Sequence, residues 1–148
     1  MNYTQEQLEN MAQRLTGTKL AYAEKNADNE SFDFGFGETA GKDFTYALHV
    51  TCSFDVIPRD EALEAGERVR VFGYDASAAE FQNYISAFFG KEIIRVAVNE
   101  KNDLWLDRGD YWVVFDTDEY SDDEAWRLTG TAPGAPALIA SGMELRAE

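Results

Sequence analysis

The residues best suited to nucleophilic or acid–base chemistry are His49, Cys52 and Ser53, which lie close together in the sequence. His49 is the only histidine and Cys52 the only cysteine, so this sequence offers neither a pair of histidine ligands nor an internal disulfide. A cysteine nucleophile needs an imidazole within hydrogen-bond reach, but side chains three positions apart on a strand point to opposite faces. Ser53 lacks the glycine-flanked turn that exposes a serine nucleophile. We therefore expect a buried thiol, a partly exposed imidazole and no catalytic residues.

The acidic segment 116–124 opens with Asp-Thr-Asp, as a calcium loop does. Further along, Tyr120 stands where a ligand belongs, Ser121 where glycine is required, and Arg127 where a bidentate glutamate belongs, which excludes an EF-hand. A looser calcium or magnesium site is the alternative, although a solvated acidic helix start explains the segment more simply. Among the 28 acidic residues, nothing singles out a pair for glycosidase chemistry. We expect no metal and no cofactor.

Two short motifs are more typical of turns than of binding sites. Gly35, Gly37 and Gly41 form a glycine-rich string, but the string lies between two strand patterns and lacks the Gly-Lys-Ser or Gly-Lys-Thr ending of a phosphate-binding loop. Arg108-Gly109-Asp110 spells an adhesion tripeptide. In a cytosolic chain, we interpret it as the turn of a hairpin, in which the glycine supplies the backbone freedom.

The first part of the chain predicts one helix followed by strands. Thr4 and Gln7 form a capping-box pattern ahead of apolar residues at helical spacing, which predicts an amphipathic helix over residues 5–15. Strands are expected over 18–25 and over 32–36, where phenylalanine occupies every second position. Beyond a turn at 38–42, alternation over 44–56 predicts one long strand, paired with the preceding strand as an antiparallel hairpin.

The strongest helical signal is an apolar stripe in the middle of the chain. It predicts an amphipathic helix over about 77–89, stopped by Gly90. The other expected elements are a helical turn at 59–66, strands at 69–73, 92–98, 103–107, 111–116 and 137–146, and a short helix at 121–128. The predicted fold class is α+β. Residues 1–148 form a single domain, in which one mainly antiparallel sheet carries the long helix and the N-terminal helix is packed against it.

Composition excludes several partner classes. The 148 residues include 28 acidic and 13 basic side chains, giving a formal net charge of −15 at pH 7. Nucleic-acid binding depends on lysine and arginine, and anionic membranes attract basic segments, so we expect neither partner. The N-terminal residues lack the apolar core of a signal peptide, and no apolar stretch reaches the length that a membrane span needs. These features predict a cytoplasmic protein.

Acidic and aromatic residues concentrate in one part of the chain. Residues 100–124 hold ten acidic and two basic side chains, with two tryptophans and two tyrosines among them. Aromatic anchors dominate many interfaces, and surrounding carboxylates steer a basic partner towards them. We therefore hypothesise a non-enzymatic acidic protein-binding domain, an inhibitor or immunity-type neutraliser of a basic protein partner. The predicted partner-binding residues are Asp107, Asp110, Trp112, Asp116, Asp118, Glu119, Tyr120, Asp122, Asp123 and Glu124.

Three other interpretations stay open. In the first, the aromatic residues fill a core, and the acidic residues only keep the chain in solution or adapt it to high salt. A small-molecule-binding or enzymatic domain would hold its ligand between the sheet and the 77–89 helix, with polar groups from Tyr46, His49, Tyr74 and Tyr84. The chain would alternatively serve as a structural subunit of a larger assembly, since its oligomeric state does not follow from the sequence.

Overall fold

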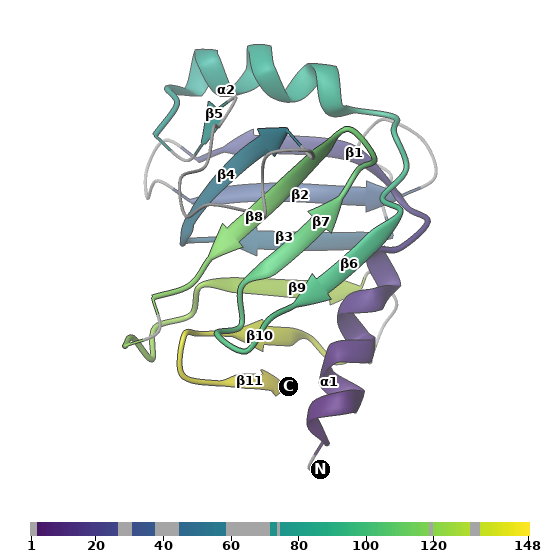
Figure 1. Ribbon diagram of the computed structural model, residues 1–148, viewed down its shortest axis with the longest axis vertical. Helices are drawn as coiled ribbons and strands as arrows, with labels where there is room; N and C mark the ends of the chain where they lie inside the picture. Colours follow the sequence, from purple (N-terminus) through teal and green to yellow (C-terminus); the bar gives the residue numbers. More distant parts are fainter. Residues whose placement is uncertain are drawn as a thin grey trace.

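Two antiparallel sheets face each other in the computed structural model, which describes residues 3–26, 31–37, 45–58, 72–73, 75–118, 120–130 and 134–148 (Figure 1). The first sheet contains, in spatial order, β1 (Lys19–Lys25), β2 (Phe32–Gly37), β3 (Tyr46–Val50), β9 (Trp126–Gly130), β10 (Leu138–Ala140) and β11 (Leu145–Ala147). The second contains β5 (Phe72–Gly73), β4 (Ser53–Pro58), β8 (Tyr111–Asp116), β7 (Leu104–Asp107) and β6 (Arg95–Val98). Their strands cross at an angle in Figure 1.

Two short helices complete the α+β fold. Helix α1 (Gln5–Ala12) continues into the 3₁₀ turn η1 (Gln13–Leu15), and α2 (Ala78–Ile85) continues into η2 (Ser86–Phe88). Each begins with a capping box, in which Thr4 or Ser77 accepts a hydrogen bond from a backbone N–H of the first turn. The helix expected over 5–15 is confirmed as α1 with η1.

The prediction of a long amphipathic helix over 77–89 is wrong, because the α-helical part ends at Ile85. The apolar stripe continues through a tighter 3₁₀ turn, which still buries Phe88 against the core. Apolar spacing alone does not distinguish these two kinds of turn, since both keep the side chains on the buried side.

The prediction of a single sheet is also wrong, because the strand expected over 44–56 is divided between two sheets. Strand β3 ends at Val50 in the first sheet, and β4 begins at Ser53 in the second. At the crossing, the backbone N–H groups of Thr51 and Cys52 both donate to the carbonyl of Ala125, at 2.8 and 3.2 Å. Alternation continues across the break because both strands turn every second side chain towards the same interior.

Several smaller predictions have clear outcomes. The β2–β3 and β7–β8 hairpins are confirmed, and Gly109 adopts a φ of 98° in the second turn, a conformation that favours glycine. The prediction of a helix over 121–128 is wrong, because β9 already begins at Trp126. The expected final strand is a hairpin of β10 and β11. The turns expected at 38–42 and 59–66 lie outside the described residues, as do all but two residues of the strand expected at 69–73.

Phenylalanine rings fill the space between the sheets. Phe32 and Phe34 of β2 meet Phe54 of β4, Phe115 of β8 and Phe81 of α2, and all five are buried. The rings of Phe32 and Phe54 lie edge to face with centroids 4.7 Å apart, and those of Phe34 and Phe115 at 5.5 Å. Such contacts add roughly 0.5–1.5 kcal/mol per pair to the burial of the rings. This aromatic layer joins both sheets and α2 into one core.

The helices also protect two sheet edges. The side-chain amide of Gln13 donates to the carbonyl of Val96 on edge strand β6, at 2.6 Å, and that of Gln82 donates to the carbonyl of Ala23 on edge strand β1, at 3.1 Å. An occupied edge carbonyl is closed to another strand. No helix in the described part of the chain is long and apolar enough to cross a membrane.

Replacing Gln82 with alanine tests this capping. We expect the free energy of unfolding in urea to fall by about 1 kcal/mol, because the edge carbonyl of Ala23 loses its partner. Gln5→Ala on α1 is the matched control, since Gln5 is exposed and bonds only to Glu9 at 3.4 Å. Both changes replace an exposed helix glutamine with alanine, so equal stabilities of the two variants would contradict the capping role.

Candidate functional site

Three loops meet at one end of the two-sheet fold. They are the β6–β7 loop (99–103), the β8–β9 loop (117–125) and the β10–β11 loop (141–144). Figure 1 shows them together at the lower left. We call this region the acidic end and build it from the residues that join its loops.

The carboxylate of Asp103 joins the first two loops. Its Oδ1 accepts from the backbone N–H of Thr117 at 2.7 Å and lies 2.9 Å from Thr117 Oγ1, while its Oδ2 accepts from the side chain of Asn99 at 3.0 Å. Thr117 Oγ1 also lies 2.6 Å from the carbonyl of Lys101. The Asp103 side chain is only 3% exposed. A buried carboxylate is stable only with such partners, so these bonds fix the two loops to each other.

Asn102 joins the third loop. Its φ of 67° lies in the left-handed region, which asparagine adopts more readily than most residues. In this conformation its side-chain amide donates to the carbonyl of Ser141 at 3.1 Å, and its own carbonyl accepts from the indole of Trp126 at 2.9 Å. Ser141 Oγ in turn accepts from the backbone N–H of Glu144 at 3.0 Å. The β10–β11 turn is thereby held beside the other loops.

The β8–β9 loop is folded by its own side chains. Asp118 Oδ1 accepts from the backbone N–H of Tyr120 at 3.0 Å, and Ser121 Oγ accepts from that of Asp123 at 3.1 Å. Side-chain bonds of this kind favour turns over helix, which explains why the acidic residues at 121–124 do not begin a helix. The loop ends at Ala125, whose N–H donates to the carbonyl of Ala140 at 2.7 Å.

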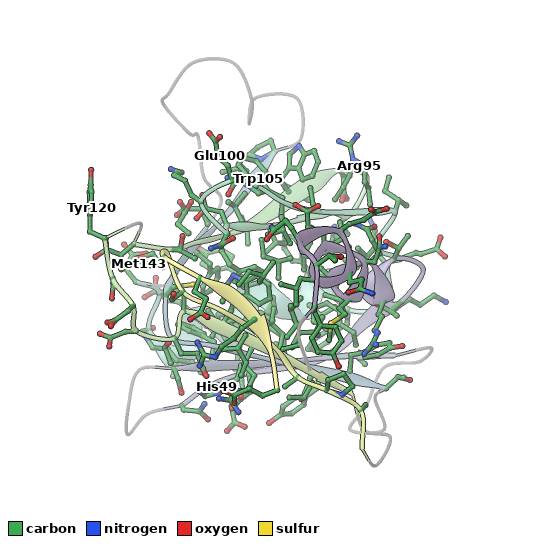
Figure 2. All side chains as sticks on the ribbon, turned by 90° about the horizontal axis from the view of Figure 1, so that it is seen from below. His49, Arg95, Glu100, Trp105, Tyr120 and Met143 are labelled. Carbon is green, nitrogen blue, oxygen red and sulfur yellow. The ribbon has the colours of Figure 1, made fainter. Side chains whose placement is uncertain are left out.

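Two large apolar side chains project from the acidic end. Tyr120 is 85% exposed and Met143 is 65% exposed. Figure 2 shows both on the same side of the molecule, with Tyr120 farthest out. The same three loops carry the described carboxylates of Glu100, Asp118, Asp122, Asp123, Glu124 and Glu144. Lys101 is the basic residue of the three loops, while Arg127 pairs with Glu124 at 2.6 Å and Arg146 lies 3.6 Å from Glu144, so the loops keep a net negative charge.

The predicted partner-binding residues divide into two groups. Asp118, Tyr120, Asp122, Asp123 and Glu124 lie together in the β8–β9 loop, and Asp116 immediately precedes it at the end of β8. Glu119 lies outside the described residues. Asp107, Asp110 and Trp112 are at or near the β7–β8 turn, at the other end of these strands. About 17 Å of strand separates the two ends of β8, at roughly 3.3 Å per residue.

Asp107 and Trp112 are not available to a partner in this structure. Asp107 is 1% exposed, and its Oδ1 accepts from the backbone N–H of Gly109 at 2.8 Å within the turn. Trp112 is 3% exposed and lies edge to face with Trp105 at 5.6 Å, beneath the guanidinium of Arg95. Both faces of β8 are apolar in the sequence, so the alternation pattern alone does not show that other parts of the protein cover both of them.

Asp110 has a structural role beside Arg108. Its carboxylate accepts from Arg108 Nε at 2.9 Å, from Arg108 Nη2 at 2.8 Å and from Lys91 Nζ at 2.8 Å. These cations, Arg108 first, hold the pKa of Asp110 well below its usual range. Arg108 is itself buried, with its guanidinium 3.9 Å from the ring centroid of Phe88. Asp110 therefore fixes the turn, and most of its charge is balanced locally.

His49 and Cys52 lie in different surroundings, as expected. On the outer side of the first sheet, His49 Nδ1 is 2.6 Å from Asp33 Oδ1, and Asp33 Oδ2 accepts from the amide of Asn26 at 2.7 Å. Sequence alternation does not indicate this cross-strand pair, because the pair depends on the β2–β3 register. Cys52 is partly buried against the core, and burial, with a smaller contribution from Asp116, raises the pKa of its thiol to about 12. A protonated thiol is a poor nucleophile.

The structure gives little room for a ligand inside the fold. A cavity of about 20 Å³ lies between the sheets, lined by apolar side chains and by Arg108, and about one water molecule fills such a space. The groups of the ligand-binding alternative are not brought together, since Tyr84 is exposed on α2 and His49 lies on the outer side of the first sheet. Tyr74 lies outside the described residues.

Among the described residues, no three histidine, cysteine or carboxylate side chains are grouped so as to hold a metal ion. The comparisons with known proteins found no match among protein-family models, curated proteins or solved structures. The candidate site is therefore defined by its own geometry. It is an acidic surface carrying two exposed apolar side chains and supported by a buried hydrogen-bond network.

Replacing Asp103 with asparagine tests the support of this surface. We expect the free energy of unfolding to fall by about 1–3 kcal/mol, because one acceptor oxygen becomes an NH₂ group facing other donors. Amide hydrogen exchange in the 117–125 loop should accelerate as well. Asp122→Asn, on the exposed surface of the same loop, should leave both quantities nearly unchanged; similar losses in the two variants would contradict the joining role of Asp103.

Asp110→Asn tests the ion pair through its pH dependence. A lowered pKa means that the carboxylate stabilises the fold fully above its ordinary pKa of about 4 and loses this effect as the pH falls through the lowered value. We expect the variant to be about 0.5–1 kcal/mol less stable at pH 7, because solvent screens this partly exposed ion pair, with the difference shrinking below pH 4. Urea unfolding across this range measures it, and a difference that does not change with pH would refute the interpretation.

Proposed function

We propose that this chain is a non-enzymatic binding protein whose acidic end engages a basic protein partner, acting as an inhibitor or immunity-type neutraliser. The observation that carries the proposal is the position of Tyr120. A tyrosine that is 85% exposed stands among several carboxylates, on a loop whose backbone is hydrogen-bonded in place.

The two kinds of side chain at this end have complementary roles in binding. An exposed aromatic ring offers a large contact area with little loss of conformational freedom, and such residues recur among binding hot spots. Carboxylates around it attract a basic surface and orient it during encounter. Met143 extends the apolar contact, and its flexible side chain adapts to an irregular partner.

The network beneath the surface favours binding in another way. A loop that is already ordered loses less conformational entropy when a partner docks. Asp103 and Asn102 supply that order from inside the fold, without using the exposed carboxylates. Asp118 is the exception among the exposed carboxylates, because one of its oxygens also shapes the turn at Tyr120.

Other features support a binding role over an enzymatic one. The imidazole of His49 is paired with Asp33 and not with the only thiol, and that thiol is held in its protonated form. The cavity between the sheets is too small for a metabolite, and the larger hollow of about 270 Å³ beside α1 is open to solvent. The net charge of −15 also suits a basic partner, since long-range attraction raises the rate of association.

A charge-removal experiment tests the location of the surface. The variant Asp118→Asn, Asp122→Asn, Asp123→Asn removes three charges from the acidic end, and asparagine at 118 keeps an acceptor for the Tyr120 N–H. With a decalysine peptide as the probe, calorimetry should show affinity reduced about tenfold, on a scale of about 0.5 kcal/mol per exposed charge pair. The salt dependence of binding should fall as well.

The matched control is Glu6→Gln, Glu9→Gln, Glu92→Gln, which removes the same charge elsewhere. Glu6 and Glu9 lie on α1, and Glu92 precedes β6. We expect this variant to bind decalysine within about twofold of the original chain. Equal losses in both triple variants would mean that overall charge, and not the acidic end, governs binding, and would sink the proposed site.

A further inference from the structure

The edge of β11, a strand of three residues, differs from the edges of β1 and β6. The edges of β1 and β6 each have a carbonyl occupied by a helix glutamine, as described above. Strand β11 lies at the edge of the first sheet, and among the described residues its strand partner is β10. Figure 2 views the molecule from the side on which the yellow β10–β11 hairpin lies, with α1 beside it.

The register shows which backbone groups of β11 face outwards. Ala137 and Glu148 exchange two backbone hydrogen bonds, at 2.8 and 2.9 Å, and Ser141 N–H donates to the carbonyl of Glu144 at 2.8 Å. Hydrogen-bonded pairs alternate along an antiparallel ladder, so Arg146 pairs with Ile139 in the same way. The N–H and C=O groups of Leu145 and Ala147 therefore point away from β10, and no described residue occupies them.

The side chains of β11 alternate in character as well. Leu145 and Ala147 pack against the apolar core. Arg146 lies on the other face between two carboxylates, 3.6 Å from Glu144 and 3.3 Å from Glu148. Each of these glutamates has a side chain that is well exposed, and together they outnumber the single arginine. The edge thus presents apolar contacts on one face and net negative charge on the other.

The edge is continuous with the acidic end. Glu144 closes the β10–β11 turn that carries Met143, and this turn is tied to Asn102 through the carbonyl of Ser141. A segment drawn in by the carboxylates around Tyr120 would therefore meet the open edge directly. Once there, it would gain main-chain hydrogen bonds from Leu145 and Ala147.

We propose that β11 accepts an extended basic segment of the partner as an added strand, a proposal that rests on the basic protein partner of the proposed function. The side-chain pattern of β11 specifies the segment. Basic residues lie opposite Glu144 and Glu148, apolar residues opposite Leu145 and Ala147, and a polar uncharged residue opposite Arg146. The recognised class is thus a strand of the order basic–apolar–polar–apolar–basic, and its backbone hydrogen bonds provide much of the affinity.

Two peptides of equal charge test the proposal on the unmodified chain. Acetyl-Lys-Lys-Val-Thr-Val-Lys-Lys-amide has the specified pattern, and acetyl-Lys-Lys-Pro-Thr-Pro-Lys-Lys-amide lacks two of the N–H donors. We expect the valine peptide to bind at least fivefold more tightly and to slow hydrogen exchange at the amides of Leu145 and Ala147 at least tenfold. Equal affinities, or exchange at these amides that stays unchanged, would overturn the added strand.

A variant of the chain gives the reciprocal test. Ala147→Pro removes an outward N–H that the β10–β11 ladder does not use, and proline is tolerated at such edge positions. We expect it to abolish the preference for the valine peptide while decalysine still binds. Ala147→Val keeps the N–H and should preserve the preference; its loss there as well would count against backbone pairing.

The outcomes separate this inference from the proposed function. If decalysine binds at the acidic end but the two patterned peptides do not differ, the added strand is wrong and the binding surface stands. If neither decalysine nor the patterned peptides bind, the proposed function fails and the added strand fails with it. The peptide pair needs no variant, so the test holds even if Ala147→Pro does not fold.

Discussion

The packing of phenylalanine rings between the two sheets is the constraint on which the rest of the structure depends. Every strand that contributes to this layer must turn alternate side chains towards one shared interior. The chain meets that requirement by crossing between sheets at Thr51 and Cys52, where one carbonyl, that of Ala125, accepts from both residues. The same carbonyl belongs to the residue that ends the β8–β9 loop. The sheet crossing and the acidic end therefore share a hydrogen-bonded junction.

Burial of apolar rings does not order the loops, and a second set of interactions does so. Asp103, Asn102 and Ser141 are buried polar residues, and each bonds to a neighbouring loop. Buried polar groups are stable only when their partners are in place, so this network tolerates one loop arrangement. The exposed carboxylates and Tyr120 are mostly outside this network, so the loops that carry them are ordered by other groups.

Several local patterns in the sequence predicted local structure, but the helix expected over 121–128 was wrong because local side-chain bonds fold that segment into turns. The capping box at Thr4 and the alternation along the strands correspond to elements of the fold, because both signals depend on neighbouring residues. Features that depend on distant residues were not predictable. The division into two sheets leaves alternation intact, the pair of His49 with Asp33 requires the register, and the covering of Trp112 requires tertiary packing. For the same reason, the sequence located the acidic loop but not its support by Asp103.

The central claim is that the surface around Tyr120 is formed before any partner binds. Backbone ¹⁵N relaxation of the free protein tests it most directly, through the order parameters of Asp118 and of residues 120–124. The hydrogen bonds of this loop predict order parameters near the rigid-backbone value of about 0.85, similar to those of β8 and β9. Values below about 0.6 would show a flexible loop and would contradict the account.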